Sequence, residues 1–407
     1  MSAQTSAGPL QGRVLRTVDE ALQHVHAICF KTGPPRRVGV ELEWTLHHLN
    51  DPTRDLTLAE LHAALGQHAP RTLDPGSPAE PLPSGSSVTL EPGGQLEISS
   101  PPADSLAGLI RSTTIDIDYL CSRLAGHGLR LGEHGIDPYR SPRLLLHTPR
   151  YNAMAQAFDR AGPAGVTMMC GTAATQVCLD AGEPEQVAYR WRTAYALGPA
   201  LLALFATAHR HAGRDTGWVS ARMRAWLGID PARAWPLVSD GDPTVAWARY
   251  ALDAPLLCLR RPGDDWHAPA GVTFADWIAG AIRPPPTVDD LEYHLGTLFP
   301  PVRPRGYLEL RFLDAQPPAE WFTPVAMLAA LLCDPATTEV AYQLAYPVAG
   351  QWATAARDGL ADPAIYKVAQ MLAELAADAL GRTDLSATTC EAVMDAIGRR
   401  LAGGGER

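Results

Sequence analysis

The residues of this chain best suited to chemistry are glutamates that recur in three short segments with the same pattern. In residues 38–44, 87–99 and 307–312, polar and apolar side chains alternate, which is typical of β-strands with one buried face. Because alternate residues of a strand point to the same side, the charged residues of each segment share one face. These charged residues are Glu41 and Glu43, then Glu91 and Glu97, and finally Glu309 with Arg311.

Five carboxylates would line one surface if these strands belong to one sheet. Carboxylates placed opposite each other on neighbouring strands repel, unless a cation lies between them. Mg²⁺ takes oxygen ligands, usually with water and nucleotide phosphates completing its octahedron. The pattern therefore favours a metal–nucleotide site, although for residues 87–99 taken alone a hairpin with ordinary solvent-facing acids is the more common case.

The element that must position most of this face is the predicted hairpin of residues 87–99. Pro92, Gly93 and Gly94 separate two alternating runs, and turn residues at such a place indicate two strands joined by a tight connection. The opposite face of the hairpin points into the core and consists of Val88, Leu90, Leu96 and Ile98.

The remaining elements predict the fold class. Residues 166–180 predict a further strand, bent near Thr172, that carries Gln176. Helical segments are scattered among the strands without strict alternation, and the chain after residue 321 is almost wholly helical. This pattern indicates an α+β fold with an antiparallel sheet covered by helices. Residues 1–12 predict a flexible tail.

Composition and charge exclude several classes of protein. The formal net charge of −10 gives no bulk attraction for nucleic acid or anionic lipid, and no apolar run is long enough to cross a bilayer. The seven cysteines are scattered, without a CxxC pair, which favours reduced thiols over a disulfide scaffold. The N-terminus lacks the apolar core of a signal peptide. We therefore expect a cytoplasmic protein that binds neither nucleic acid nor membrane.

Several of these segments resemble the plant-type glutamate-cysteine ligases, in order along roughly residues 36–320. The short form of the chain and its helical end after Trp321 resemble most the bacterial branch that supplies γ-glutamylcysteine for ergothioneine synthesis. The segments that carry the resemblance are Gly39 to Glu43, Leu90 to Glu97, Pro149 to Tyr151, Thr172 to Val177, Trp218 to Arg222, His294 to Pro300 and Tyr307 to Arg311.

The resemblance implies a fold and a reaction. The fold is a curved antiparallel sheet that forms a funnel flanked by helices, as in the catalytic core of glutamine synthetase. One catalytic domain would span residues 1–407, with a sheet-containing core over residues 13–320 and a helical part over residues 321–400. The reaction joins glutamate to cysteine with ATP as co-substrate and two or three Mg²⁺ ions, through γ-glutamyl phosphate.

The resemblance also implies roles for individual residues. Glu309 and Arg311 are expected to be catalytic, and Arg311 and Gln176 are expected to contact ATP. The residues expected to hold Mg²⁺ are Glu41, Glu43, Glu91, Glu97 and Glu309, and those expected to bind the amino-acid substrates are Arg150, Tyr151, Met169, Thr172, Gln176, Arg222 and Trp226.

Some of these residues have a simpler explanation that the sequence leaves open. Gln176 lies on an apolar strand and could be a hydrogen-bonded amide of the core. Arg311 could form a cross-strand salt bridge with a glutamate, and Arg150 or Arg222 taken alone could be a surface residue. Met169 and Trp226 are of types that usually belong to the core.

Three rival functions also remain open from the sequence. The same ligase chemistry could use an amine other than cysteine, because the acidic strands handle only ATP and the acyl donor. A metal-dependent amide hydrolase also uses clustered carboxylates, but it would need an activated water and no ATP. A binding protein that kept the fold and lost activity is disfavoured, because all five glutamates and Arg311 are present.

Overall fold

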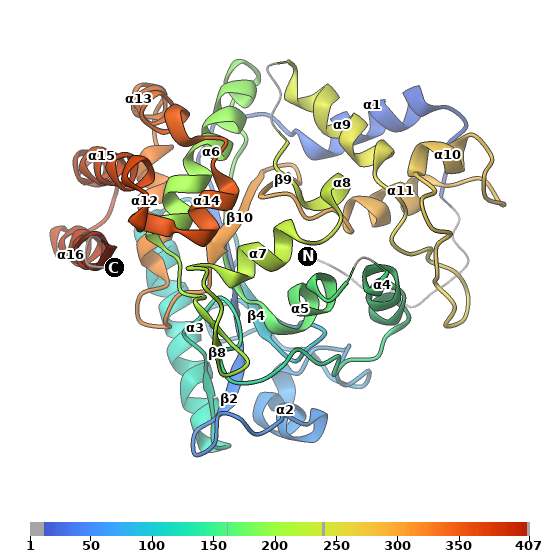
Figure 1. The fold of residues 1–407 in the computed structure, drawn as a ribbon, viewed down its shortest axis with the longest axis horizontal. Helices are drawn as coiled ribbons and strands as arrows, with labels where there is room; N and C mark the ends of the chain where they lie inside the picture. Colours follow the sequence, from blue (N-terminus) through green and yellow to red (C-terminus); the bar gives the residue numbers. More distant parts are fainter. Residues whose placement is uncertain (1–11, 161, 238–240, 405–407) are drawn as a thin grey trace.

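A six-stranded antiparallel sheet forms the centre of the protein (Figure 1). The computed structural model describes residues 12–160, 162–237 and 241–404, so the predicted tail lies outside the described residues except for Gly12. Within them the α+β prediction with an antiparallel sheet and flanking helices is confirmed. The strand order across the sheet is β3 (Ser87–Leu90), β4 (Leu96–Ser99), β1 (Val38–Trp44), β6 (Ala174–Leu179), β10 (Leu308–Asp314) and β9 (Val302–Pro304).

The predicted hairpin is confirmed as β3 and β4, and its turn explains the two glycines. Gly94 has a φ of +86°, in the left-handed region that favours glycine. A Cβ added to Gly93 would lie 2.1 Å from the carbonyl oxygen of Cys170, so the turn packs directly against the segment before β6. The hairpin is thereby held on the rest of the sheet.

One face of the sheet packs into the core. Val40 of β1 pairs with Val177 of β6, and Val177 also pairs with Leu310 of β10, so apolar side chains line up across neighbouring strands. Several helices contact these strands and share one apolar core with them. They include α3 (Leu106–Gly126), which contacts β1, α6 (Pro184–Leu204), which contacts β10, and α12 (Phe322–Leu331), which contacts β6.

The segment over residues 166–180 differs from its prediction as one bent strand. Residues Ala164–Gly171 form helix α5, and only Ala174–Leu179 forms strand β6. A short apolar run has no periodicity that separates a buried helix from a buried strand, so the surroundings decide. Helix α5 lies against α4 (Pro149–Asp159) and α7 (Ala221–Leu227), which no pattern within the segment itself could indicate.

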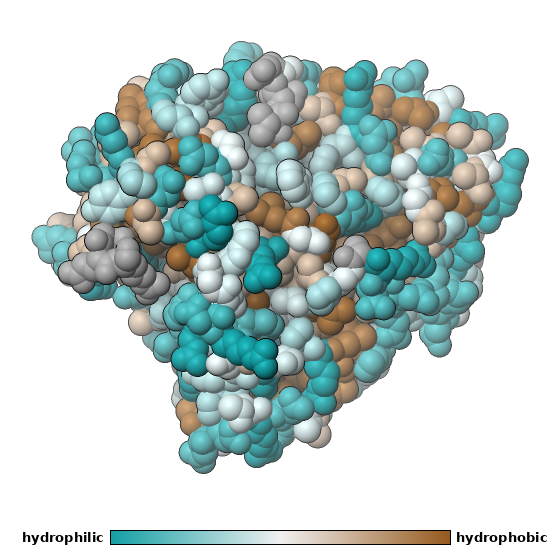
Figure 2. Space-filling model, viewed as in Figure 1, coloured by the Kyte–Doolittle hydropathy of each residue, from teal (hydrophilic) through white to brown (hydrophobic). Residues whose placement is uncertain are grey.

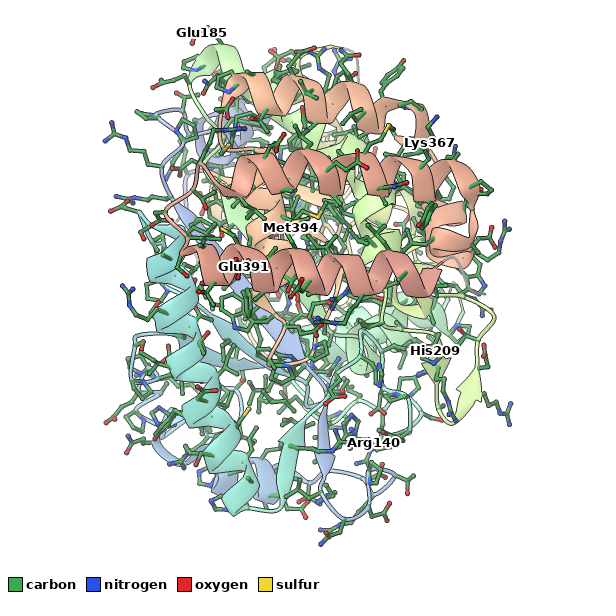
Figure 3. The ribbon with its side chains drawn as sticks, turned by 90° about the vertical axis from the view of Figure 1, so that its left-hand side faces the viewer. Arg140, Glu185, His209, Lys367, Glu391 and Met394 are labelled. Carbon is green, nitrogen blue, oxygen red and sulfur yellow. The ribbon has the colours of Figure 1, made fainter. Side chains whose placement is uncertain are left out.

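The chain after Trp321 is helical wherever it has regular structure. Figure 3 shows α15, which carries Lys367, between two other helices, one of which is α16 with Glu391 and Met394. In Figure 1 these helices gather at the left of the sheet. Their bounds are α13 (Pro335–Ala345), α14 (Trp352–Arg357), α15 (Pro363–Leu380) and α16 (Ala387–Gly404), with 3₁₀ turns at Tyr346–Val348 and Gly359–Ala361.

The other elements complete the layers around the sheet. In Figure 1, α9, α10 and α11 lie at the right, away from the C-terminal helices. Two further two-stranded sheets pair β2 with β5 and β7 with β8. The bounds are α1 (Val18–Cys29), β2 (Leu46–His48), α2 (Leu58–Leu65), a 3₁₀ turn at Gly66–His68, β5 (Leu129–Leu131), β7 (Arg210–His211), β8 (Arg214–Asp215), α8 (Pro231–Ala234), α9 (Pro243–Asp253), α10 (Phe274–Ile278) and α11 (Val288–Leu295).

The surface in the same view mixes polar and apolar residues, and Figure 2 shows apolar residues exposed in the middle of this face. Within the described residues, no single helix is long and apolar enough to cross a membrane. Residues Phe322–Leu331 and Pro335–Val348 pass that test only as a pair, and this pair is bent by 106°.

Candidate active site

The register of the sheet brings the predicted acidic residues together on its second face. Residues paired directly across an antiparallel ladder point to the same side. Glu43 of β1 is paired with Glu97 of β4, and Glu41 of β1 is paired with Gln176 of β6. Glu309 of β10 is paired with Cys178 of β6, two residues beyond Gln176. The interpretation that these segments share one sheet and one polar face is therefore confirmed.

Four of the glutamates carry raised pKa values. Burial, followed by the charges of Glu309 and Glu97, raises the pKa of Glu41 to about 7. Burial raises the pKa of Glu97 to about 7 and that of Glu91 to about 8, with neighbouring carboxylates adding to both shifts. Burial also raises the pKa of Glu43. Crowded, partly buried carboxylates of this kind offer hard oxygen atoms that fit Mg²⁺.

Glu309 differs from the other four because three arginines surround it. Its Oε2 accepts hydrogen bonds from Nε of Arg303 at 2.6 Å and from Nη1 of Arg311 at 2.8 Å. Nη1 of Arg305 lies 3.3 Å from Oε1. Glu309 is fully buried, and although burial opposes ionisation, the three guanidinium groups hold the pKa of its carboxyl far below the usual range. The protein itself therefore supplies the counter-charge of Glu309.

A thiol borders this acidic face. The ligand atoms of Glu41, Cys178 and Glu309 all lie within 4.8 Å of one another, so these residues form a cluster that could hold a cation. Burial raises the pKa of the Cys178 thiol well above its usual range. A protonated thiol is a poor ligand for a hard cation, so the oxygen atoms of the two glutamates fit Mg²⁺ better than the sulfur does.

Gln176 links the acidic residues to Arg311. Its side chain is 2% exposed and lies on the polar face of β6, not in the apolar core. Its Nε2 donates to Oε1 of Glu43 at 2.5 Å, and its Oε1 accepts from Nη1 of Arg311 at 2.5 Å. The amide therefore fixes the positions of one acidic and one basic group at once.

Arg222 and Arg311 share one aromatic platform. Their guanidinium carbons lie 5.1 Å and 5.4 Å from the centre of the Trp226 ring, within the range of cation–π contact. Arg222 is buried and donates from Nη2 to the backbone oxygen of Arg311 at 2.7 Å. Nε of each arginine and Nε1 of Trp226 are buried and have no hydrogen-bond partner among the described residues. Three donors thus remain for a ligand.

Arg150 and Tyr151 lie at the Glu91 end of the acidic face. Thr148 caps helix α4 by accepting from the backbone N–H of Tyr151, which places both residues in the first turn. The charge of Arg150 partly offsets the raised pKa of Glu91, and burial, with the charge of Glu91, raises the pKa of Tyr151. Nη2 of Arg150 donates to the backbone oxygen of Gly296 at 2.9 Å.

Met169 and Thr172 form hydrogen bonds within α5 and to the hairpin, away from the five glutamates. The hydroxyl of Thr172 donates to the backbone oxygen of Met168 at 2.6 Å. The backbone oxygens of Met169 and Thr172 both accept from Nε2 of Gln95, at 3.2 Å and 2.9 Å. Among the described residues, neither side chain has a polar contact with the five glutamates. These two residues tie α5 to the hairpin, and their predicted contact with substrate stays a prediction.

The structure also places Thr89 at this face, as the alternation of the hairpin predicts, together with three residues that the strand patterns do not indicate: Cys178, Arg303 and Arg305. Thr89 donates to Oε1 of Glu97 at 2.6 Å across the hairpin. Arg303 is paired with Glu309 across β9 and β10. Two arginines only four and six residues before Glu309 were a usable signal, but their role depends on the turn that folds β9 back onto β10.

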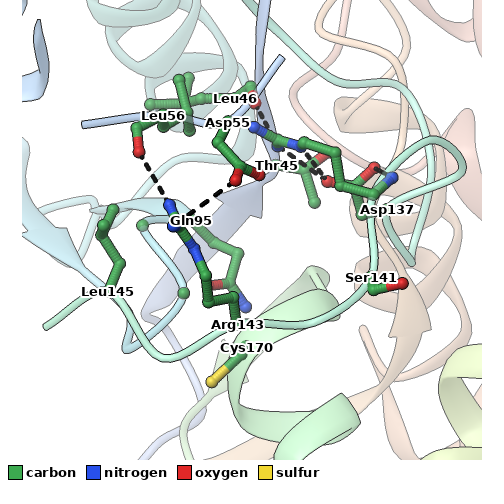
Figure 4. A pocket seen from close by; sticks show the side chains of 13 residues that line it. Thr45, Leu46, Asp55, Leu56, Gln95, Asp137, Ser141, Arg143, Leu145 and Cys170 are labelled. Carbon is green, nitrogen blue, oxygen red and sulfur yellow. Dashed lines mark hydrogen bonds and ion pairs between the residues drawn. The ribbon is translucent and has the colours of Figure 1, made fainter. Parts of the chain in front are cut away.

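A small pocket behind the hairpin turn is lined by none of the five glutamates of the acidic face (Figure 4). It is lined in part by Gly93 and Gly94 and has a volume of about 30 Å³, room for about one water molecule. Its two guanidinium groups already have partners, since Arg140 lies 2.7 Å from Asp137 and Arg143 lies 3.5 Å from Asp55. These ion pairs fit a structural role for the pocket.

The fold and this face define a ligase of known family. Residues 37–407 match the model of glutamate-cysteine ligase family 2 (GCS2), and the chain belongs to this family. The chain is 40% identical over 371 residues to glutamate–cysteine ligase EgtA of Mycolicibacterium smegmatis, covering 89% of this chain and 84% of that protein. It is 42% identical over 366 residues to EgtA of Mycobacterium tuberculosis, covering 88% and 82%. The family resemblance found in the sequence is thereby confirmed.

A solved structure supports the fold. The crystal structure of a glutamate–cysteine ligase from Francisella tularensis in complex with AMP matches 93% of this chain and 83% of that chain. The TM-score is 0.50 at 12% sequence identity, so the likeness concerns the fold alone.

Proposed function

We propose that this protein joins the γ-carboxylate of glutamate to the amine of cysteine at the expense of ATP, forming γ-glutamylcysteine for ergothioneine biosynthesis. The observation that carries the proposal is the convergence of Glu41, Glu43 and Glu97 on one face, with Glu91 close enough to interact with them and Arg311 bonded to Gln176, in a member of this ligase family. The names of the relatives support cysteine as the acceptor and ergothioneine as the pathway.

Two or three Mg²⁺ ions fit the carboxylates of this face. Glu41, Glu97 and Glu309 would hold the ion nearest the ATP phosphates, and Glu43 and Glu91 would hold the ion nearer the transferred group. When bound, Mg²⁺ offsets the negative charge that ATP and the substrate carboxylate bring together. The raised pKa values of Glu41, Glu91 and Glu97 support this assignment, because they reflect the burial and mutual repulsion of these carboxylates, which a cation would relieve.

The basic residues bind and orient the reacting groups. Arg311 is held by Gln176 and Glu309 through Nη1, which leaves its unpartnered Nε available for a phosphoryl oxygen. Arg222 and Arg150 have the planar fork that suits an α-carboxylate. Tyr151, Met169, Thr172 and Trp226 complete the proposed substrate pocket, with Trp226 fixing the planes of two guanidinium groups.

The reaction proceeds in two steps. An oxygen of the γ-carboxylate attacks the γ-phosphorus of ATP, the bond from that phosphorus to the β,γ-bridging oxygen breaks, and ADP leaves. The amine nitrogen of cysteine then attacks the acyl carbon of γ-glutamyl phosphate. The bond from that carbon to the phosphate oxygen breaks, inorganic phosphate leaves, and the nitrogen loses a proton. Arg311 offsets the charge that develops on the transferred phosphoryl group.

We further propose that residues 1–407 work as one catalytic domain in the cytoplasm. One apolar core runs from Leu15 to Ile397, which supports a single domain. The seven cysteines are free, which supports a reducing compartment.

The test is incubation of the purified protein with ATP, Mg²⁺, L-glutamate and L-cysteine, followed by mass spectrometry of the products. We expect γ-glutamylcysteine and an equal amount of ADP. ADP without that dipeptide would show that another amine is the acceptor. Dipeptide hydrolysis without ATP consumption would favour the amide hydrolase and reject the proposal.

A further inference from the structure

A second group of basic side chains lies beside the Glu91 end of the acidic face. The guanidinium carbons of Arg150 and Arg260 lie 5.0 Å and 5.2 Å from the centre of the Tyr293 ring. The three residues come from distant parts of the chain: Arg150 begins α4, Tyr293 lies in α11, and Arg260 follows a bridge between Cys258 and His267. The fold therefore places two cations against one aromatic ring.

Neither guanidinium group forms an ion pair within the described part of the chain, although the charge of Arg150 acts on Glu91 from further away. The buried Arg233, by contrast, lies 3.1 Å from a carboxylate oxygen of Asp230. Nε of Arg260 is buried and has no hydrogen-bond partner among the same residues. Partly buried charges without a partner are costly, so this arrangement favours an anionic ligand.

The neighbours of the two arginines do not supply the missing negative charge. Burial raises the pKa of Tyr293 to about 12, although the charge of Arg150 opposes this, so its hydroxyl is neutral at physiological pH. Burial also raises the pKa of the Cys258 thiol, whose Sγ lies 3.8 Å from the Tyr293 hydroxyl. Trp266 packs edge-on against Tyr293 with 5.8 Å between ring centres. Tyr293 orients the guanidinium groups through its ring and, for Arg150, through a side-chain hydrogen bond, but its neutral side chain does not neutralise their charge.

The place of this group relates it to the amino-acid substrates. The charge of Arg150 lowers the pKa of Glu91, so the two residues are electrostatic neighbours. An anion bound by Arg150 would thus lie next to the acidic face. A carboxylate matches a guanidinium group in a planar, two-bond contact, and both amino acids of the proposed reaction carry an α-carboxylate.

We propose that Arg260 and Tyr293 complete, together with Arg150, a binding site for the α-carboxylate of an amino-acid substrate. This inference rests on the proposed ligase function and assigns Arg260 and Tyr293 to substrate binding. The source of the carboxylate is either glutamate or cysteine, and the two are distinguished by which Michaelis constant changes.

The first experiment compares Arg260→Gln with Arg261→Gln in the steady-state assay with ATP, glutamate and cysteine. Arg261 is the matched control, because it is the next residue, is exposed and loses the same charge. We expect Arg260→Gln to raise the KM for one amino acid about 10- to 100-fold, the usual effect of losing a hydrogen bond to a charged group. The KM for ATP should stay unchanged, and Arg261→Gln should behave as the natural protein.

Three further variants separate charge from geometry. Arg260→Lys keeps the charge and loses the planar fork, so it should recover only part of the affinity. Tyr293→Phe keeps the ring and should have little effect, whereas Tyr293→Leu removes the platform and should raise the same KM as Arg260→Gln. Thermal unfolding of each variant shows whether it is folded. A change confined to the KM for ATP, or no change in any KM, would overturn the proposal.

A binding measurement keeps this test separate from the ligase function. Calorimetric titration of the natural protein with glutamate and with cysteine should give binding that Arg260→Gln weakens and Arg261→Gln does not. If the natural protein binds neither amino acid, the inference is rejected. If it binds one of them through Arg260 but makes no γ-glutamylcysteine, the carboxylate site stands and the proposed function fails.

Discussion

Arg303 of β9 and Glu309 of β10 face each other across neighbouring strands, with 2.6 Å between Nε and Oε2. Arg305 and Arg311 complete the charge balance of Glu309, while the other four glutamates of this face have raised pKa values. One face of one sheet therefore carries a carboxylate that is ionised by its protein neighbours and carboxylates whose ionisation is opposed by burial. This difference leads to opposite expectations for the stability of two similar variants, Glu41→Gln and Glu309→Gln.

Glu41→Gln removes a carboxylate whose pKa is raised by burial and by repulsion from Glu309 and Glu97. Without metal, the free energy of unfolding should rise by on the order of 1 kcal/mol, because a crowded charge is lost. Ligase activity should fall about 100-fold or more if Glu41 holds the cation. Calorimetry with and without Mg²⁺ checks the stability, where stabilisation by Mg²⁺ should also weaken, and the ligase assay with ATP, glutamate and cysteine checks the activity. Full activity of this variant would contradict the metal assignment.

Glu309→Gln should remove activity and also destabilise the protein. The substitution leaves Arg303 and Arg311 buried without their shared counter-charge, and breaking a buried ion pair in this way costs about 3–5 kcal/mol. Glu320→Gln is the control, because Glu320 also pairs with two arginines but is about one-third exposed. Its loss should cost under about 1 kcal/mol in urea unfolding. Equal stability of the two variants would contradict the role of Glu309.

The metal-free protein should lose stability as the pH rises. The carboxyl groups of Glu41, Glu91 and Glu97 have pKa values of about 7, 8 and 7 in the folded protein, against an ordinary value of 4.5. Between these values the folded protein keeps protons that the unfolded chain has released, so stability falls through this range. Glu309 is ionised in both states there and adds no change.

Melting temperatures measured across that pH range check this expectation. With EDTA present, the melting temperature should fall as the pH rises, and excess Mg²⁺ should remove the fall by offsetting the released charges. Addition of Mg²⁺ to the metal-free protein in this pH range should also release protons, which a pH-stat titration measures. A melting curve that is independent of both pH and Mg²⁺ would mean that these carboxylates are not a cation site.

Gln176→Leu should lower kcat more than it raises KM. The amide holds Arg311 against Glu43, and a leucine of similar volume keeps the packing but removes both hydrogen bonds. Arg311 keeps its contact with Glu309, so we expect a loss of about 10-fold in kcat from poorer positioning. Steady-state kinetics provide the measurement, with Cys178→Ser as the control on the same face of β6. A loss in the control as large as that in Gln176→Leu would assign the effect to packing.

Much of this site follows from alternation along single strands. Period two alone places Glu41 and Glu43 on one side of β1, and the same holds for Glu309 and Arg311 of β10. The register between neighbouring strands cannot be predicted from this alternation, because it depends on strands that are far apart in the chain. The pairing of Glu43 with Glu97 and that of Glu41 with Gln176 could not be obtained from any one segment.

The same dependence on distant partners explains the helix that was predicted as a strand and the site residues that the sequence does not indicate. Residues 164–171 form a helix because of what they pack against, whereas their own sequence fits a strand equally well. Tyr293 and Arg260 gave no signal in the sequence, since the cation–π contacts that join them to Arg150 arise only from the fold. Local pattern therefore predicts which side chains share a face, and tertiary structure decides which faces meet.

The position of β1 in the sheet has a consequence for the synthesis of this protein. One edge of β1 pairs with β4, but the other pairs with β6, which ends at Leu179. Until that residue leaves the ribosome, β1 presents an open edge to other nascent chains, for an interval on the order of ten seconds at usual rates of translation. Contacts between neighbouring nascent chains should therefore be avoided during the interval in which the second edge of β1 is unpaired.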